Sequence, residues 1–228
     1  MHTLVGKTAR EWEIDNIGLT GFRNTVRLSR SQLLAVLERA RNLKTRQPGA
    51  GSSLTYVAGT DPDDVVVELQ RPVEVLAYLL TMKERSGLRW ERISFCCVGD
   101  GSSDIVASLM LTGALLGMDV RIVASGAAAP TDAVSDAAHD LATRHHGSLL
   151  VTADRERALR DARFVVSIPY TQGVAPTLAE SLGSDDPAAP LCNLVEEENV
   201  NRAHVMEAVL AEWLTGGPGS TWSSPDPS

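Results

Sequence analysis

Apolar residues recur at helical spacing in two stretches of the first third of the chain. From residue 29 to residue 44, leucine and alanine return every three or four positions, which predicts an amphipathic helix. Ser29 and Gln32 form a capping-box pattern at its start, because the hydroxyl can accept from the third amide while the glutamine reaches back. Pro72 suits the first turn of a second helix, which has a wide apolar face.

Short continuous apolar runs predict strands, listed here by residue number: 54–58, 65–69, 93–98, 120–124, 149–152 and 164–168. Helical patterns follow the later runs: one through Gly117, then 131–145, 155–160 and 196–214. Alternating strands and helices with continuously apolar strands are typical of a parallel sheet covered on both faces. The predicted fold class is therefore α/β, a Rossmann-like parallel sheet with helices on both faces.

Composition places the chain among globular proteins. Its 228 residues carry a formal charge of −8, with 43% hydrophobic and 22% charged residues. No apolar run approaches the roughly 20 residues of a membrane helix, and residues 1–15 contain charges and no apolar signal region. Cys96 and Cys97 are adjacent on a predicted strand and point to opposite faces, and Cys192 is distant, so neither a disulfide framework nor a metal site is expected. We expect a cytoplasmic, reduced protein without membrane contact.

Charge is unevenly distributed along the chain. Residues 1–50 hold nine basic and four acidic side chains, whereas the remaining residues are strongly acidic. A basic segment of this kind can bind nucleic acid. Five of the basic residues follow one amphipathic helix with no aromatic residue between them, namely Arg30, Arg39, Arg41, Lys44 and Arg46. A solvated helix face is therefore the favoured interpretation, and no nucleic-acid partner is expected.

The strand-to-helix turn at 98–104 is the strongest local signal for a ligand. Ligands of open parallel sheets bind at the carboxyl ends of strands, and glycines there allow close approach to backbone amides. A dinucleotide fingerprint needs a third glycine where Asp104 stands, and an acidic residue at the end of the next strand, which closes on Ala124–Ser125. No phosphate loop, nucleophile elbow or metal-ligand spacing occurs either. We expect neither a cofactor nor a metal.

Four segments together resemble one enzyme family in order and spacing. They are Arg71–Thr81 (RPVEVLAYLLT), Val98–Leu109 (VGDGSSDIVASL), 117–124, and Glu198–His204 (ENVNRAH). The family is that of the aspartate/ornithine carbamoyltransferases, closest to the ornithine type. The resemblance implies an amino-acid-binding α/β lobe and an N-terminal lobe that binds carbamoyl phosphate.

Several departures from the family pattern bear on function. The family's catalytic His and its Gln are Arg71 and Glu74 here, its ornithine-binding Asn is Asp104, and residues 167–173 lack the family's Asp. The Ser-Thr-Arg-Thr and His-Cys-Leu-Pro motifs are absent. Residues 49–70 number only 22, fewer than the roughly 30 of a strand–helix–strand unit, so most of the phosphate-binding lobe is expected to be missing. Ordinary ornithine carbamoyltransferase activity is therefore not expected.

The resemblance implies four parts of the chain. Residues 1–85 form a truncated N-terminal lobe with a linking helix, and residues 86–195 form the amino-acid-binding lobe. Residues 196–214 form a C-terminal helix that returns to the N-terminal lobe. Residues 215–228, of which ten are Gly, Pro or Ser, form a disordered tail.

The same resemblance implies the site. Arg71 and Glu74 are the expected catalytic residues, with Arg71 as an anion clamp, and Glu74 or Asp104 as the group that holds a substrate amine. The expected substrate contacts are Gly99, Ser103, Asp104, Thr171, Gln172 and Arg202. A structural alternative stands beside two of these: Arg71 can pair with Glu68 or Glu74, and Asp104 can cap the following helix.

Two functions follow as hypotheses. The first is a diverged carbamoyltransferase-like transferase that joins an amino acid or other amine to an anionic, carbamoyl-phosphate-like co-substrate. The second is a non-catalytic amino-acid-binding or scaffolding relative. The expected partners are a small amino acid and carbamoyl phosphate or another anion, in a homo-oligomer for which a dimer covering exposed sheet edge is one form.

Overall fold

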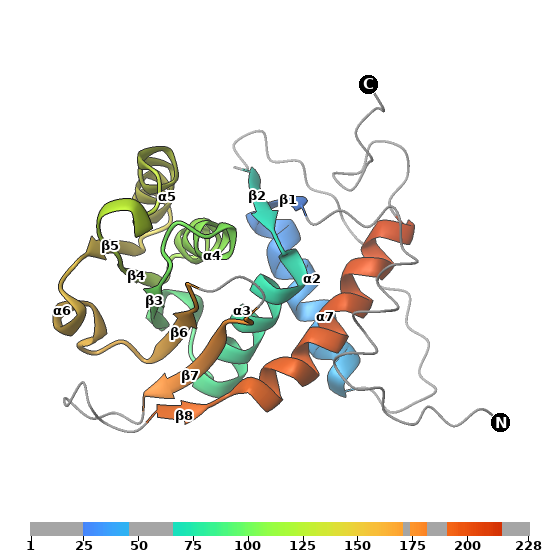
Figure 1. Cartoon of the computed structure of the whole chain (residues 1–228). Helices are drawn as coiled ribbons and strands as arrows, with labels where there is room; N and C mark the ends of the chain where they lie inside the picture. The colour runs from blue at the N-terminus through green and yellow to red at the C-terminus, as the bar shows by residue number, and fades with distance from the viewer. Residues whose placement is uncertain (1–24, 46–65, 171–173, 182–190, 216–228) are drawn as a thin grey trace.

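The computed structural model describes residues 25–45, 66–170, 174–181 and 191–215, and Figure 1 shows how their elements are arranged. The predicted strand at 54–58 and the predicted tail at 215–228 lie outside the described residues, apart from Thr215. None of the described helices is long and apolar enough to cross a membrane.

A six-stranded sheet forms the larger part of the fold, in the order β5-β4-β3-β6-β7-β8. Its strands are β3 (Ser94–Gly99), β4 (Asp119–Val123), β5 (Ser148–Thr152), β6 (Phe164–Ile168), β7 (Thr177–Ser181) and β8 (Leu191–Asn193). The first four run parallel, as the apolar runs predict. β7 and β8 continue the sheet antiparallel, an extension that the sequence pattern did not predict.

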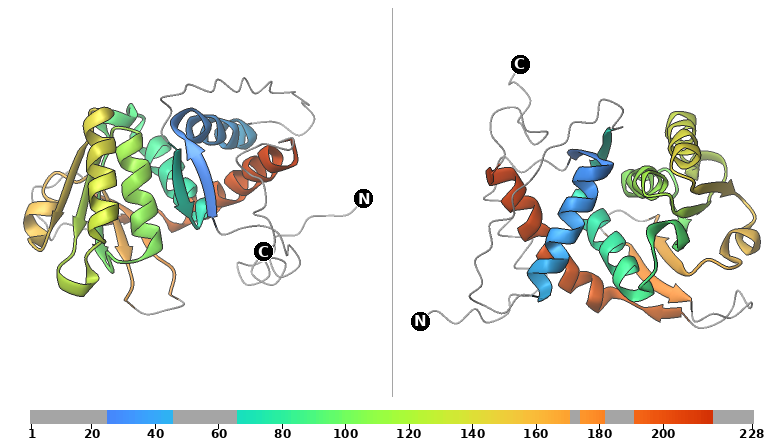
Figure 2. Two further views of the ribbon diagram at one scale, coloured as in Figure 1. Left: turned by 90° about the horizontal axis from the view of Figure 1, so that it is seen from above. Right: turned by 180° about the vertical axis from the view of Figure 1, so that it is seen from behind.

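Helices cover both faces of this sheet. α4 (Asp104–Leu115) and α5 (Asp132–Arg144) lie on one face, and the short α6 (Arg155–Leu159) lies on the other (Figure 2). This follows from right-handed crossovers, since β3, β4 and β5 step in one direction and the chain then returns to β6. Phe95, Ile122 and Phe164 are fully buried in the core against Leu109 of α4. The predicted α/β class is therefore confirmed.

A second unit is built from three helices and a two-stranded antiparallel sheet. β1 (Thr25–Ser29) pairs with β2 (Val66–Gln70), and α2 (Arg30–Thr45) follows β1. α3 (Pro72–Ser86) follows β2, and α7 (Val195–Thr215) packs along both α2 and α3 (Figure 1). The division of the chain into lobes stays a prediction.

The capping box at the start of α2 is confirmed. The Ser29 amide donates to Oε1 of Gln32 at 2.8 Å, and the Gln32 amide donates to Oγ of Ser29 at 3.3 Å. Both amides would otherwise lack partners in the first turn. The local sequence thus fixes where α2 begins.

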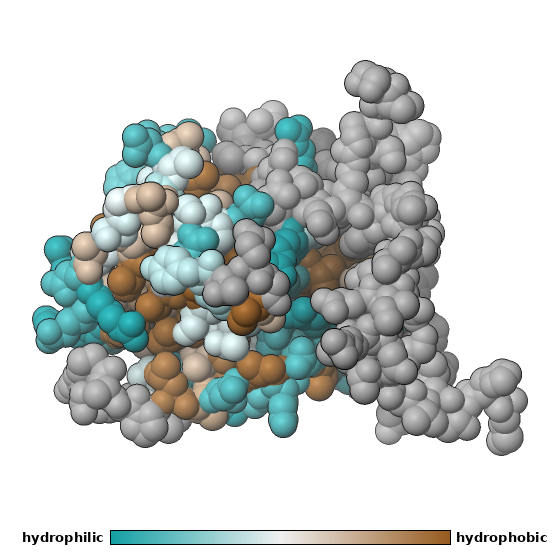
Figure 3. Space-filling model, viewed as in Figure 1, coloured by the Kyte–Doolittle hydropathy of each residue, from teal (hydrophilic) through white to brown (hydrophobic). Residues whose placement is uncertain are grey.

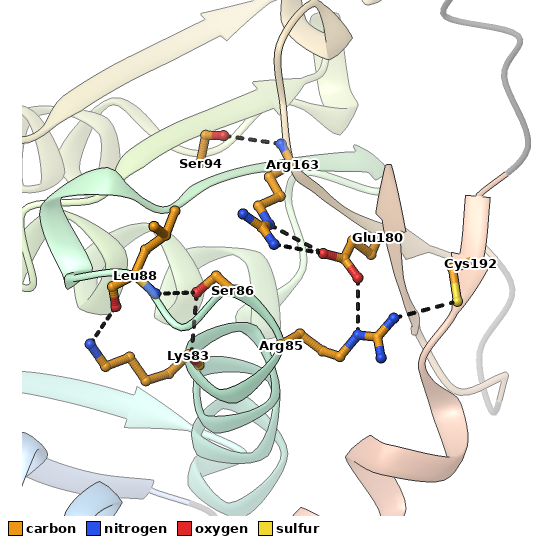
Figure 4. A network of polar contacts seen from close by, with 8 residues as sticks. All are labelled: Lys83, Arg85, Ser86, Leu88, Ser94, Arg163, Glu180 and Cys192. Carbon is orange, nitrogen blue, oxygen red and sulfur yellow. Dashed lines mark hydrogen bonds and ion pairs between the residues drawn. The ribbon is translucent and has the colours of Figure 1, made fainter. Parts of the chain in front are cut away.

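An arginine–glutamate network joins α3 to the antiparallel side of the sheet (Figure 4). Glu180 of β7 is only 7% exposed, and it accepts from Nε of Arg85 at 3.0 Å and from Nη2 of Arg163 at 3.1 Å. Two charged donors compensate the burial of this carboxylate. On the side of the molecule seen in Figure 1, apolar areas and polar side chains alternate over the surface of the described residues (Figure 3).

A buried amide holds α7 on α2 and α3. Asn201 of α7 is fully buried, and its Oδ1 accepts from Nζ of Lys44 at 3.0 Å. Its Nδ2 donates to Oγ1 of Thr81 and to Oε2 of Glu84, both at 3.0 Å. Because the amide reaches side chains of both other helices, it fixes the register of α7 against them.

Replacing this amide should weaken the packing of α7. We expect Asn201→Ala to lower the free energy of unfolding by about 2 kcal/mol, because buried donors and acceptors lose their partner. Urea unfolding followed by circular dichroism measures the change. Asn199→Ala is the matched control, since Asn199 is exposed on the same helix and its loss should cost little. Equal stability of the two variants would contradict the role of the network.

Candidate functional site

The turn between β3 and α4 is closed by its own hydrogen bonds. Oδ1 of Asp100 accepts from the Ser102 amide at 3.1 Å and from its hydroxyl at 2.6 Å, and the Ser103 hydroxyl donates to the Asp100 carbonyl at 2.9 Å. The Asp100 amide donates to the Ile168 carbonyl at 3.2 Å, which ties the turn to the end of β6. Most of these polar groups thus stabilise the conformation of the turn itself.

A glycine is required at position 99 because the backbone of β6 lies very close to it. Its φ of 121° is in a region that other residues rarely adopt, and a Cβ there would lie 1.9 Å from the Ile168 carbonyl oxygen. The sequence pattern favoured a ligand as the reason for this glycine. The structure gives a sufficient reason within the sheet itself.

Ser103 and Asp104 begin α4. Ser103 is the N-cap residue, without a side-chain capping bond, and Asp104 is the first residue of the helix. The alternative interpretation of Asp104 as the N-cap is therefore wrong by one position. Its exposed carboxylate still lies in the first turn, where negative charge is favourable.

Four charged side chains gather where α3 begins and α7 passes. Arg71 Nη2 lies 2.6 Å from Glu74 Oε2, and Arg202 Nη2 lies 2.7 Å from Glu198 Oε1. Arg202 Nη2 also lies 4.0 Å from Glu74 Oε1. We call Arg71, Glu74, Glu198 and Arg202 the ionic cluster. It contains two positive and two negative groups.

The ionic cluster is asymmetric in its exposure. The side chains of Arg71 and Arg202 are 49% and 38% exposed, whereas those of Glu74 and Glu198 are 6% and 4% exposed. The arginines thus lie between solvent and two buried carboxylates. Arg71 itself has left-handed backbone angles just before Pro72, which directs the chain from β2 into α3.

Burial raises the pKa of both buried carboxyl groups of the ionic cluster. It raises the pKa of Glu74, against the lowering effect of Arg71 and Arg202. It also raises the pKa of Glu198, against the lowering effect of Arg202. A carboxyl with a raised pKa can accept a proton from an amine more readily than an exposed one.

Tyr78 connects the ionic cluster to the segment between β6 and β7. It is fully buried one turn after Glu74, and its hydroxyl donates to the Pro176 carbonyl at 2.9 Å. Burial raises the pKa of this phenol, as do the nearby carboxylates of Glu198 and Glu74. Tyr78 thus holds the end of this segment against α3.

The structure brings together some of the predicted site residues. Arg71, Glu74 and Arg202 meet in the ionic cluster. Gly99 at the end of β3, and Ser103 and Asp104 at the start of α4, flank the turn between these elements, as their positions predict. Within the described part of the chain, no hydrogen bond or ion pair joins that turn to the cluster.

The remaining predictions have mixed outcomes. Thr171 and Gln172 lie outside the described residues, as does the side chain of Glu68. The alternative pairing of Arg71 with Glu74 is confirmed. Among the described residues, no three His, Cys, Asp or Glu side chains are placed to hold a metal ion.

Glu198 and Tyr78 are the members of the site that the sequence interpretation missed. Glu198 precedes Arg202 by four residues on α7, and Tyr78 follows Glu74 by four residues on α3. Residues at this spacing share one helix face, so a search for ionisable groups beside the predicted ones would have found both.

The larger sheet is of the open α/β type, in which ligands bind at the carboxyl ends of the parallel strands, here those of β3 and β6. Residues 91–172 match the family model of the aspartate/ornithine carbamoyltransferase Asp/Orn-binding domain. This part of the chain is thus similar to the Asp/Orn-binding domain of the aspartate/ornithine carbamoyltransferases, the family that the sequence motifs resemble.

Individual relatives agree with this placement. The ornithine carbamoyltransferase of Cutibacterium acnes is 40% identical over 112 residues, covering 49% of this chain and 34% of that protein. The catabolic ornithine carbamoyltransferase of Enterococcus faecalis is 32% identical over 132 residues, covering 58% and 36% respectively. The chain thus matches about a third of the length of these curated relatives.

A solved structure supports the fold. The ornithine carbamoyltransferase from Pyrococcus furiosus aligns with a TM-score of 0.50 and 21% identity, over 63% of this chain and 56% of that one. At this identity the likeness concerns the fold alone.

The requirement for Gly99 can be separated from ligand binding. We expect Gly99→Ala to lower the free energy of unfolding by roughly 3 kcal/mol or more, or to prevent folding, because its Cβ would clash with β6. Gly126→Ala is the control: it also has a positive φ but meets open space, so about 1 kcal/mol is expected. Thermal unfolding compares the two. Similar stabilities would contradict the close approach.

Glu198 should make stability depend on pH. Because its pKa is raised in the fold, the folded state binds the proton more tightly than the unfolded state. This contribution is present below the ordinary value of 4.5 and is lost as pH rises through the raised pKa. We therefore expect Glu198→Gln to gain stability relative to the wild type as pH rises from 4.5 towards neutrality.

Urea unfolding of both proteins across this pH range measures the difference. Glu156→Gln, which changes a carboxylate that is 72% exposed, is the control for the loss of a surface carboxylate. A difference for Glu198→Gln that stays constant or reverses sign would contradict the expected shift.

Proposed function

We propose that this chain binds an amino acid or a related small amine, at the carboxyl edge of the sheet beside the start of α3. The match to the Asp/Orn-binding domain supports this class of ligand. The relatives are described as ornithine carbamoyltransferases, and ornithine is an amino acid with a second amine. The proposed ligand site includes the ionic cluster and Pro176, which Tyr78 holds against α3.

The charge balance of the ionic cluster is the observation that carries this proposal. A carbamoyl donor has a phosphate that needs uncompensated positive charge, and transfer needs preorganised donors at the developing charges. Arg71 and Arg202 are the two predicted cations, and each already lies against a buried carboxylate. This arrangement favours binding of an amino acid, whose own charges also balance, over binding of a phosphate donor.

A diverged carbamoyltransferase-like transferase is the second candidate. The raised pKa of Glu74 favours it, because this carboxyl could take the proton from an attacking amine. Arg71 is exposed enough to contact an anionic co-substrate at the same time. In this mechanism the amine attacks the carbonyl carbon of the donor, its proton passes to Glu74, and the anion leaves towards Arg71.

Assembly and location stay predictions. A homo-oligomer, with a dimer as one form, is compatible with the edge strands β5 and β8, each of which has one strand partner among the described residues. A cytoplasmic location and the absence of a nucleic-acid partner rest on the sequence alone.

Ligand-induced thermal stabilisation tests the proposed function. The wild type is melted with ornithine, aspartate, related amino acids, phosphate and carbamoyl phosphate. We expect an amino acid to raise the melting temperature, since a ligand at 100 times its dissociation constant adds about 2.7 kcal/mol. Arg71→Gln should lose this shift, because Arg71 is the most exposed cation of the cluster.

Arg89→Gln is the control for this experiment, because Arg89 is 82% exposed beside the 3-10 turn Trp90–Arg92 and outside the cluster. It should keep the full shift. A shift with carbamoyl phosphate, followed by product formation from an amine, would support the transferase instead. An absence of any shift would overturn both candidates.

A further inference from the structure

Glu74 lies where two arginines from different helices converge. Its Oε2 is paired at 2.6 Å with Arg71, the N-cap residue of α3, and its Oε1 faces Arg202 of α7 at 4.0 Å. The residue is 5% exposed, so the carboxylate lies beneath two guanidinium groups that reach solvent. A carboxylate between two guanidinium groups is the arrangement that a bound anion would have.

The hydrogen bonding of Glu74 is incomplete. Among the described residues, no donor lies within hydrogen-bond distance of Oε1, although this oxygen is buried. A buried carboxylate oxygen without a donor is costly, so good packing or pairing of this side chain alone does not account for its position. The position of Glu74 between the two arginines thus costs stability.

We infer that Glu74 is an internal counter-anion that occupies the anion position of the site and thereby excludes phosphate-like dianions. The inference rests on the proposed function for the location of the ligand site. It adds the residue that decides which ligands the site rejects. A dianion would have to lie beside a buried carboxylate, and the repulsion between like charges opposes that.

The two carboxylates of the ionic cluster differ in position, which allows a charge-matched comparison. Glu198 lies four residues before Arg202 on the same helix and accepts from both Nε and Nη2 of that arginine, at 3.0 and 2.7 Å. Glu74 contacts both arginines. Replacing either carboxylate by Gln removes one negative charge, but only the change at Glu74 removes the charge that lies between the two guanidinium groups.

Sulfate is the probe, because it stays a dianion over the working pH range, and binding is measured by calorimetry at constant ionic strength. We expect Glu74→Gln to bind sulfate about tenfold more tightly than the wild type, through charge-assisted hydrogen bonds from the two arginines. The increase in sulfate affinity should be much smaller for Glu198→Gln. The double variant Glu74→Gln/Arg71→Gln should lose the gain.

Three results would overturn the inference: equal sulfate affinity in the wild type and Glu74→Gln, an equal gain in Glu198→Gln, or a gain that survives the loss of Arg71. The second result would show that net charge alone matters. Glu156→Gln controls for the loss of a distant exposed carboxylate and should bind sulfate as the wild type does.

A measurement on the wild type keeps the inference testable if Glu74→Gln does not fold. Protonation of Glu74 should remove the same negative charge, so sulfate affinity should rise as pH falls from neutrality. The charged and titratable groups around it are Arg71 and Tyr78 on α3, and Glu198 and Arg202 on α7. Glu198→Gln should keep this rise, and a flat profile in both proteins would contradict the role of Glu74.

The outcome is separable from that of the proposed function. Sulfate binding gained in Glu74→Gln while no amino acid binds the wild type would support the counter-anion and overturn the amino-acid site. Amino-acid binding without any gain for sulfate would support the proposed function and overturn the counter-anion.

Discussion

Helix α7 packs along α2 and α3, and the ionic cluster exists only because of that contact. Glu198 and Arg202 come from α7, whereas Arg71 and Glu74 lie more than a hundred residues earlier at the start of α3. Asn201, which lies between Glu198 and Arg202 in the sequence, is hydrogen-bonded to side chains of both α2 and α3. The same helix therefore supplies half of the charges and the polar contacts that hold them in register.

Charge compensation and burial act against each other in this cluster. The two arginines favour ionised carboxylates, and burial favours the protonated form, with the result that the pKa values of Glu74 and Glu198 are raised. A site with balanced charges and buried carboxylates has little attraction for a phosphate group. It suits a ligand that brings charges of both signs. This is the physical basis for the proposed amino-acid ligand and for the proposed exclusion of dianions.

The six-stranded sheet illustrates how backbone constraints can resemble sequence signals for a ligand. The glycine-containing turn after β3 has the sequence and position of a ligand loop, yet Gly99 is needed by the Ile168 carbonyl and Asp100 closes the turn on itself. On the antiparallel side of the sheet, Glu180 of β7 accepts hydrogen bonds from Arg85 and Arg163 and so contributes stability (Figure 4). The polar contacts that stabilise the sheet thus involve other residues than the polar contacts of the candidate site.

The sequence by itself determined the parallel strands β3 to β6, the start of α2 and the family of the lobe, because apolar periodicity, capping and short motifs are local signals. It also singled out Arg71, Glu74 and Arg202 through their motif positions. It missed the short strands β1, β7 and β8, since their partners are chosen by pairing across the sheet. Only the tertiary structure decided that Glu74 lies between two arginines and that Tyr78 reaches Pro176, because distances between remote helices depend on packing.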